Sequence, residues 1–189
     1  MTGPETADGD AEEGDAYGGL LGAFPYAFRA SGSWLFRSYV VLGGVLAAVV
    51  AVLFAISLVV LVGNTTGTAG GVFTFSRAFF IVVGFLVVAP LVAPVLYVAR
   101  RRRRGTVTSD GYDAAMALAG YVFVLALYVG LVTSIPECFE FGAQVTCRDP
   151  PTGLFAPLVR VLYALPPVAG LLPPALAGAA IVLLDRSLR

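Results

Sequence analysis

The stretch YVVLGGVLAAVVAVLFAISLVVLV, residues 39–62, contains no charged residue, and Ser57 is its one polar side chain. A helix of roughly 20 apolar residues crosses the hydrocarbon core of a bilayer. Three further runs of similar length carry no charge, and a protein this short has too little polar chain to cover four such helices in water. The sequence therefore predicts an all-α integral membrane bundle of four transmembrane helices, with spans at about 39–62, 78–99, 114–135 and 161–184.

The composition of the 189-residue chain removes most catalytic chemistry. Its 12 basic residues are all Arg and balance 12 acidic ones, and it has no His. Without Lys or His there is no amine for a Schiff base and no imidazole base, and two Cys cannot complete a four-ligand zinc site. Balanced charge gives no overall field that attracts nucleic acid. We expect a protein that is not an enzyme, with no catalytic residue, metal, cofactor or nucleic-acid partner.

The positions of the arginines predict how the chain is threaded. Short loops that are rich in Arg stay in the cytoplasm. With the N-terminus inside, nine arginines are cytoplasmic, and three are outside: Arg77, Arg148 and Arg160. We therefore expect a multi-pass protein of the cell membrane with both termini cytoplasmic, an inner loop at 100–113, and outer loops at 63–77 and 136–160. The first span is expected to be a retained signal anchor, since it follows an acidic tail.

The N-terminal region divides into two parts before the transmembrane domain of residues 39–189. Residues 1–19 hold six acids and no basic residue, a composition that cannot bury enough apolar surface to fold, so we expect a disordered cytoplasmic tail. Residues 20–38 interleave aromatic rings with Arg29 and Arg37, which predicts an interfacial segment at headgroup depth. Ser33 is placed to cap the incoming helix.

Two cysteines, Cys138 and Cys147, lie in PECFEFGAQVTCRDPP within the second predicted outer loop. Exported compartments are oxidising, so we expect a disulfide that closes a loop of about ten residues. The first predicted outer loop carries Asn64-Thr65-Thr66, an acceptor tripeptide that makes Asn64 a candidate glycosylation site.

Five consecutive arginines follow the second predicted span. They are Arg100, Arg101, Arg102, Arg103 and Arg104. Such a cluster anchors its loop on the cytoplasmic side, and it also attracts anionic lipid headgroups. We expect both roles, so the predicted partners are the lipid bilayer and its anionic lipids.

Prolines interrupt two of the predicted spans, and each interior proline removes a helix hydrogen bond. Kinks are therefore expected at Pro90 and Pro94 in the second span, and at Pro166, Pro167, Pro173 and Pro174 in the fourth. A plain structural kink is one interpretation. The alternative is a broken fourth helix that lines a substrate cavity, as in transporters. The start of the fourth span is also open, since residues 153–165 could form an interfacial helix before a shorter span that begins near Pro166.

Charged residues are absent from the interior of all four predicted spans. Because such charges mark ion pathways and proton relays, their absence argues against ion-coupled transport by this chain alone. We expect a non-enzymatic membrane component or accessory subunit, with a membrane-protein partner or as a homo-oligomer. A passive transporter or channel that uses the proline-broken fourth helix is the alternative.

Two resemblances add to these expectations. Four spans with an exposed cysteine pair resemble the quinone-linked thiol oxidases of the bacterial periplasm, which implies a third candidate function, a membrane thiol/quinone oxidoreductase. The first outer loop lacks the second cysteine pair of those enzymes. The tail TADGDAEEGDAYGG and the run RRRRR resemble small multi-spanning proteins of extremely halophilic archaea, which implies a halophilic habitat and a membrane location but no activity.

Overall fold

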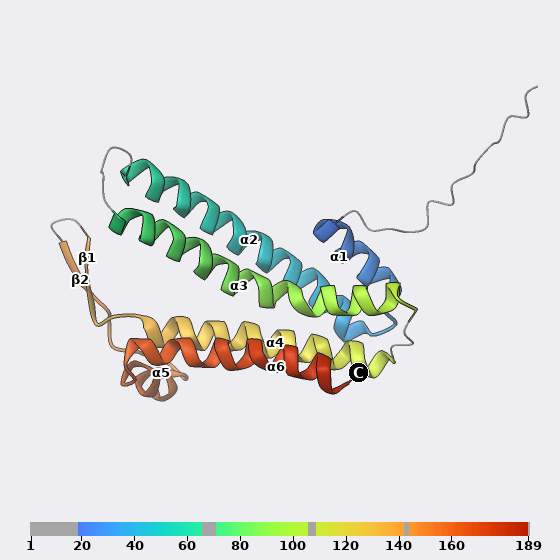
Figure 1. The fold of residues 1–189 in the computed structure, drawn as a ribbon. Coiled ribbons are helices and arrows are strands. Elements are labelled where there is room, and N and C mark those ends of the chain that lie inside the picture. Colours follow the sequence, from blue (N-terminus) through green and yellow to red (C-terminus); the bar gives the residue numbers. More distant parts are fainter. Residues whose placement is uncertain (1–18, 66–70, 106–108, 142–143, 189) are drawn as a thin grey trace, which may run out of the picture.

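The computed structural model describes residues 19–65, 71–105, 109–141 and 144–188, so the predicted acidic tail lies almost wholly outside the described residues. The elements are α1 (Gly19–Ala30), α2 (Trp34–Thr65), α3 (Gly71–Arg103), α4 (Asp110–Ser134), β1 (Cys138–Phe141), β2 (Gln144–Cys147), α5 (Ala156–Tyr163), the 3₁₀ helix η1 (Pro167–Leu171) and α6 (Leu172–Ser187) (Figure 1).

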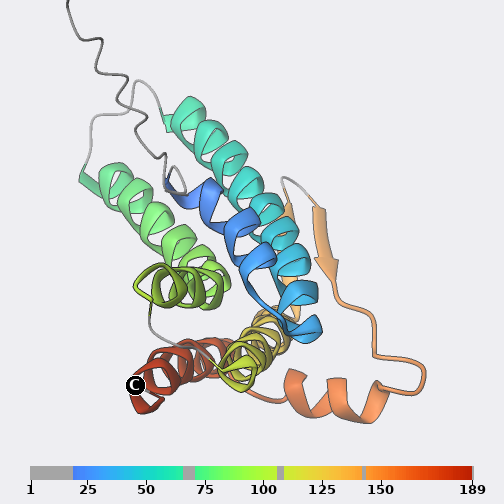
Figure 2. The ribbon, with the colours of Figure 1, turned by 90° about the vertical axis from the view of Figure 1, so that its right-hand side faces the viewer.

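Among the described residues, four helical segments are long and apolar enough to cross a membrane, which confirms a mostly helical fold with the predicted number of candidate spans. They cover Trp34–Gly63, Arg77–Arg103, Asp110–Ser134 and Pro167–Ser187. The apolar run that begins at Val161 is divided: its first residues belong to α5, and the fourth long segment starts at Pro167. In Figure 1 α5 is seen end-on while α4 and α6 run across the view, and Figure 2 shows α5 lengthwise, so α5 crosses the ends of these helices steeply.

The long helices form two antiparallel pairs, α2 with α3 and α4 with α6 (Figure 1). The pairs meet where α3 ends in arginines, which we call the Arg-rich end, and they diverge toward the β1–β2 hairpin, which we call the hairpin end. This divergence gives the protein a closed half and an open half.

The buried core lies in the closed half. Its largest fully buried side chains are Phe36, Tyr39, Leu91, Val95, Val98, Met116, Phe123 and Ile181. The core also includes α1, because Ala23 and Ala27 are fully buried against its neighbours. Part of the predicted interfacial segment is therefore a packed helix, and small side chains spaced by one helical turn let α1 approach the spans closely.

A close contact between α2 and α4 fixes the core. A Cβ on Gly120 would lie 2.2 Å from Cζ of Tyr39, so only glycine leaves room for this ring. The Tyr39 hydroxyl reaches α3, where it donates a hydrogen bond to the carbonyl of Leu91 at 2.7 Å. That carbonyl lies in the turn before Pro94, where the proline disturbs the hydrogen bonds of the helix. The hydrogen bond from the Tyr39 side chain stabilises α3 in this turn.

The prolines fall into two groups. Pro90 and Pro94 lie inside α3, which continues through both and changes direction along its length (Figure 1). The four prolines of the last apolar run lie just before a helix or in its first turn, not in the interior of one long helix as the sequence predicts. Pro166 precedes η1 and Pro167 begins it, and Pro173 and Pro174 lie in the first turn of α6, where the missing N–H would have no helical partner.

The hairpin confirms the predicted disulfide. Cys138 and Cys147 are directly opposite in the antiparallel register and are joined by a disulfide with an S–S distance of 2.05 Å. Arg148 follows the second strand and donates through Nη1 to the carbonyl of Ile135 at 2.9 Å. Its guanidinium also lies 3.9 Å from the ring centroid of Tyr163. The base of the hairpin is therefore tied to the end of α4 and to α5.

Candidate functional site

Two carboxylates are buried at the Arg-rich end, each paired with an arginine from the end of α3. We call this group the end cluster. It contains Ser31, Arg101, Arg102, Tyr112, Asp113 and Asp185. Its members come from the α1–α2 turn and from three of the long helices, so the cluster connects segments that are far apart in the sequence.

Asp113, in the first turn of α4, is fully buried. Its Oδ2 accepts from the hydroxyl of Ser31 at 2.5 Å and from Nη2 of Arg102 at 2.5 Å. Charged groups this far from water persist when they are paired and hydrogen-bonded. Asp110 also lies near Arg102, at 3.7 Å, but 71% of its side chain is exposed, so this second pair is weaker.

Asp185, near the end of α6, accepts from the hydroxyl of Tyr112 at 2.7 Å and pairs with Nη2 of Arg101 at 3.1 Å. The same guanidinium lies 4.1 Å from the ring centroid of Tyr112. It also donates to the backbone carbonyls of Asp185 at 2.7 Å and Leu188 at 3.0 Å. Arg101 thereby satisfies carbonyl groups that the end of a helix leaves without partners.

The end cluster stabilises the junction of the two helix pairs. Two buried polar atoms of the cluster, Asp113 Oδ1 and Arg102 Nε, have no hydrogen-bond partner among the described residues. The hydrogen bonding of the cluster is therefore nearly complete. Among these residues no group of three or more His, Cys, Asp or Glu side chains is arranged to hold a metal ion. The geometry is that of a structural clamp.

Asp113 and Asp185 lie directly outside the predicted spans at 114–135 and 161–184, and the sequence analysis predicted neither their burial nor their pairing. A signal was present: five arginines end one span, and carboxylates lie at the ends of two others on the same predicted side. Of the predicted lipid contacts, Arg101 and Arg102 point into the end cluster, whereas Arg100, Arg103 and Arg104 are exposed.

The open half contains an apolar cleft between the two helix pairs, with a volume of about 650 Å³. It is lined by Leu46, Val50, Leu53 and Phe54 of α2, Val87 of α3, Val124, Leu127, Tyr128, Gly130, Leu131 and Ser134 of α4, Gly170 and Leu171 of η1, and Pro174 of α6. None of these side chains is charged. The Ser134 hydroxyl is already used, since it donates to the carbonyl of Pro167 at 3.2 Å.

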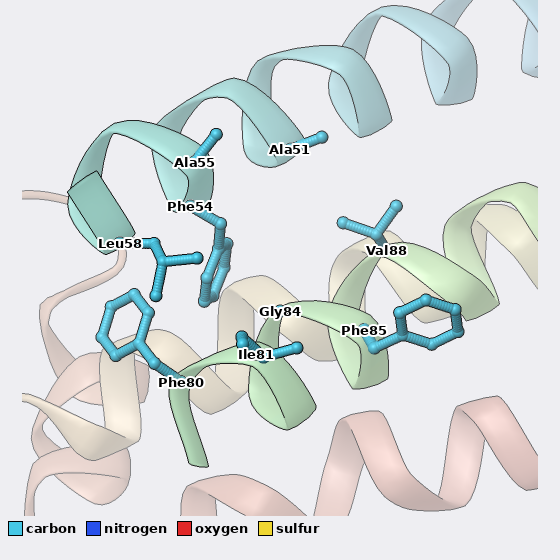
Figure 3. A pocket seen from close by; sticks show the side chains of 9 residues that line it. All are labelled: Ala51, Phe54, Ala55, Leu58, Phe80, Ile81, Gly84, Phe85 and Val88. Carbon is cyan, nitrogen blue, oxygen red and sulfur yellow. The ribbon is translucent and has the colours of Figure 1, made fainter. Parts of the chain in front are cut away.

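A smaller groove of about 300 Å³ lies between α2 and α3 (Figure 3). Phe54 points from α2 toward α3, and its ring centroid is 5.4 Å from that of Phe80. A Cβ on Gly84 would lie 3.0 Å from the Phe54 ring. Phe54 also lines the larger cleft, so the contact between α2 and α3 fixes one of the cleft walls.

The candidate glycosylation site gains no structural description. The backbone of Asn64 belongs to the end of α2, but its side chain and Thr66 lie outside the described residues. The acceptor tripeptide therefore remains a prediction from the sequence.

The fold and site together define a helical protein with four candidate membrane spans, clamped at one end and open at the other. The chain belongs to the family described as a domain of unknown function, DUF8056, whose model matches residues 7–189. No curated protein and no solved structure matched the chain. The family match includes the end cluster, the cleft and the disulfide hairpin within one domain.

Proposed function

We propose that this protein is a non-enzymatic component of a membrane assembly, an accessory subunit that offers helix α2 to a partner helix. The observation that carries the proposal is the exposure of α2. Only 6% of its most apolar window is buried within the chain, compared with 22%, 28% and 17% for the other three spans.

The exposed surface of α2 has the composition of a helix contact. Its large apolar residues include Val45, Val49, Val52, Ile56 and Val59, each about half exposed or more. Ala48 and Ala55 are exposed among them. Small residues between branched ones let helices pack closely by dispersion, which is the main attraction between helices in lipid.

The end cluster supports a scaffold role. It fixes α3, α4 and α6 at one end, so α2 is carried on a preorganised frame through its contact with α3. Binding by a rigid surface loses less conformational entropy than binding by a mobile one.

The proposed orientation places the Arg-rich end and both termini in the cytoplasm and the disulfide hairpin outside. Two independent features favour it: arginine-rich loops stay inside, and disulfides belong to exported compartments. The exposed arginines at 100, 103 and 104 are then proposed to meet the anionic lipids of the cytoplasmic leaflet.

The test is co-purification of the full chain from its own membranes in mild detergent. We expect a partner in fixed stoichiometry that is lost in a V52W variant and retained in the matched control L118W, on the exposed face of α4. A protein that purifies alone, or only as a homo-oligomer, would contradict the subunit proposal.

A further inference from the structure

We propose that the cleft between the helix pairs is a lipid-binding site that holds the hydrocarbon tails of one bilayer lipid. The proposal concerns the open half of the molecule and is independent of the partner surface on α2.

The lining of the cleft selects a hydrocarbon ligand. Its walls are mainly Leu, Val and Phe side chains, and its volume of about 650 Å³ lies within the roughly 300–1,000 Å³ that small-molecule sites occupy. No lining residue is charged, and the Ser134 hydroxyl is already bonded. Tyr128, which is 64% exposed, brings the one other hydroxyl to the lining, so the cleft offers a polar ligand little to recognise. An apolar chain makes dispersion contacts throughout such a space.

Fixed contacts hold the shape of each wall of the cleft. At the hairpin end, a Cβ on Gly130 would lie 2.3 Å from the carbonyl oxygen of Gly170, so the backbones of α4 and η1 touch there. On the opposite wall the Phe54 ring is held against Gly84 and Phe80.

The length of the cleft suits lipid tails. Its lining runs from Leu46 to Phe54 along α2 and from Val124 to Ser134 along α4, which are lengths of about 12–15 Å at 1.5 Å per residue. A hydrocarbon tail that lies along this length has its methylene groups against apolar side chains.

Lipid also has direct access to the site. Leu53, Leu131 and Leu171 line the cleft and are 58%, 68% and 66% exposed, so the cleft is continuous with the outer faces of the spans. In a membrane those faces meet hydrocarbon chains, which can enter sideways without crossing a polar layer.

The experiment uses the full chain in liposomes that contain a phospholipid with a photoactivatable diazirine in its tail. After irradiation, mass spectrometry maps the modified peptides. We expect modification concentrated in residues 46–54 and 124–134, with one such lipid retained per chain in native mass spectra.

The variants decide between a site and general lipid contact. L127W places an indole in the cleft, and L125W places one on the neighbouring exposed face as the control. We expect cleft labelling to fall about tenfold in L127W, because the indole takes the volume that the tails need, and to stay unchanged in L125W. V50F fills the opposite wall and serves if L127W does not fold, as judged by circular dichroism and gel filtration.

Three outcomes would overturn the proposal: equal labelling in the filled and wild-type proteins, labelling spread evenly over the exposed faces, or cleft residues left unlabelled in the wild type. None of these depends on whether α2 binds a partner, so the two proposals fail separately.

Discussion

Arg102 at the end of α3 and Asp113 at the start of α4 form an ion pair in which Nη2 and Oδ2 lie 2.5 Å apart and the carboxylate is fully buried. The connecting segment is short, so the pair sets the angle at which the second helix pair leaves the first. The same carboxylate accepts from Ser31, so the pair also positions the turn that leads into α2.

Removal of Asp113 tests how strongly this pair holds the fold. D113A removes the buried partner of Arg102 and leaves the exposed Asp110 at 3.7 Å, and breaking a buried pair costs about 3–5 kcal/mol. Because one-fifth of the Arg102 side chain is exposed, we expect a loss at the lower end of that range. Detergent-induced unfolding followed by circular dichroism measures it.

The matched control is D110A, three residues earlier. Asp110 contacts the same guanidinium from an exposed position. We therefore expect D110A to lower the free energy of unfolding by less than about 1 kcal/mol, including the loss of a favourable negative charge at a helix N-terminus. Equal losses of stability in D113A and D110A would show that the burial of Asp113 does not strengthen its pair with Arg102.

A second prediction concerns Arg101, whose planar guanidinium stacks on Tyr112 while it donates to two backbone carbonyls at the C-terminal end of α6. R101K keeps the charge but offers a compact ammonium that cannot make all these contacts. We expect a loss of about 1–3 kcal/mol and faster amide hydrogen exchange in residues 184–188.

The exposed Arg104 provides the comparison, since R104K also keeps the charge. We expect this variant to exchange and unfold like the wild type. If R101K behaved in the same way, the arginine run would act through its charge alone, as the sequence suggests for its topological role.

The features that the sequence predicts are those that depend on one segment at a time. The length of a charge-free run decides whether a helix can span a bilayer, so the four spans can be predicted without any knowledge of tertiary contacts. The pairing of Cys138 with Cys147 is equally local, since the chain holds only these two cysteines.

The features that the sequence leaves open depend on contacts between segments. The end cluster needs Asp185 and Arg101, which are far apart in the chain, to meet at one helix end. The cleft arises because two helix pairs diverge, and no residue type marks divergence. Pro173 and Pro174 look like kinks in an apolar run, but α6 begins at Leu172, after η1, so they fall in its first turn.

A third prediction addresses the disulfide. The double variant C138S/C147S is expected to keep its long helices but to open the β1–β2 hairpin more readily, by about 2–3 kcal/mol for a loop of this length. Hydrogen exchange in residues 138–147 measures the change. The reduced wild type should exchange like the variant, and reductant should not change the exchange of the variant. If the hairpin were equally protected in all three states, strand pairing and the contacts of Arg148 would be enough to hold it without the disulfide.

The fourth prediction concerns glycine in α4. G120A would bring a methyl group to 2.2 Å from Cζ of Tyr39, a fully buried ring whose hydroxyl is fixed on α3. The ring cannot move without losing that hydrogen bond, so we expect a loss of about 1–3 kcal/mol despite the better helix propensity of alanine. Thermal unfolding in detergent measures it.

In the same helix, a Cβ on Gly111 would meet its nearest neighbour, the Ser109 hydroxyl, at 3.6 Å, which is ordinary van der Waals contact. G111A should therefore be neutral or stabilise the protein by up to about 1 kcal/mol through helix propensity. Phenylalanine keeps the Cζ atom but lacks the hydroxyl that fixes the ring on α3. If G120A cost much less in a Y39F background than in the wild type, the hydrogen bond to Leu91 would be what prevents the ring from moving aside. Identical stability of G120A and G111A would contradict the close approach of α2 and α4 at this position.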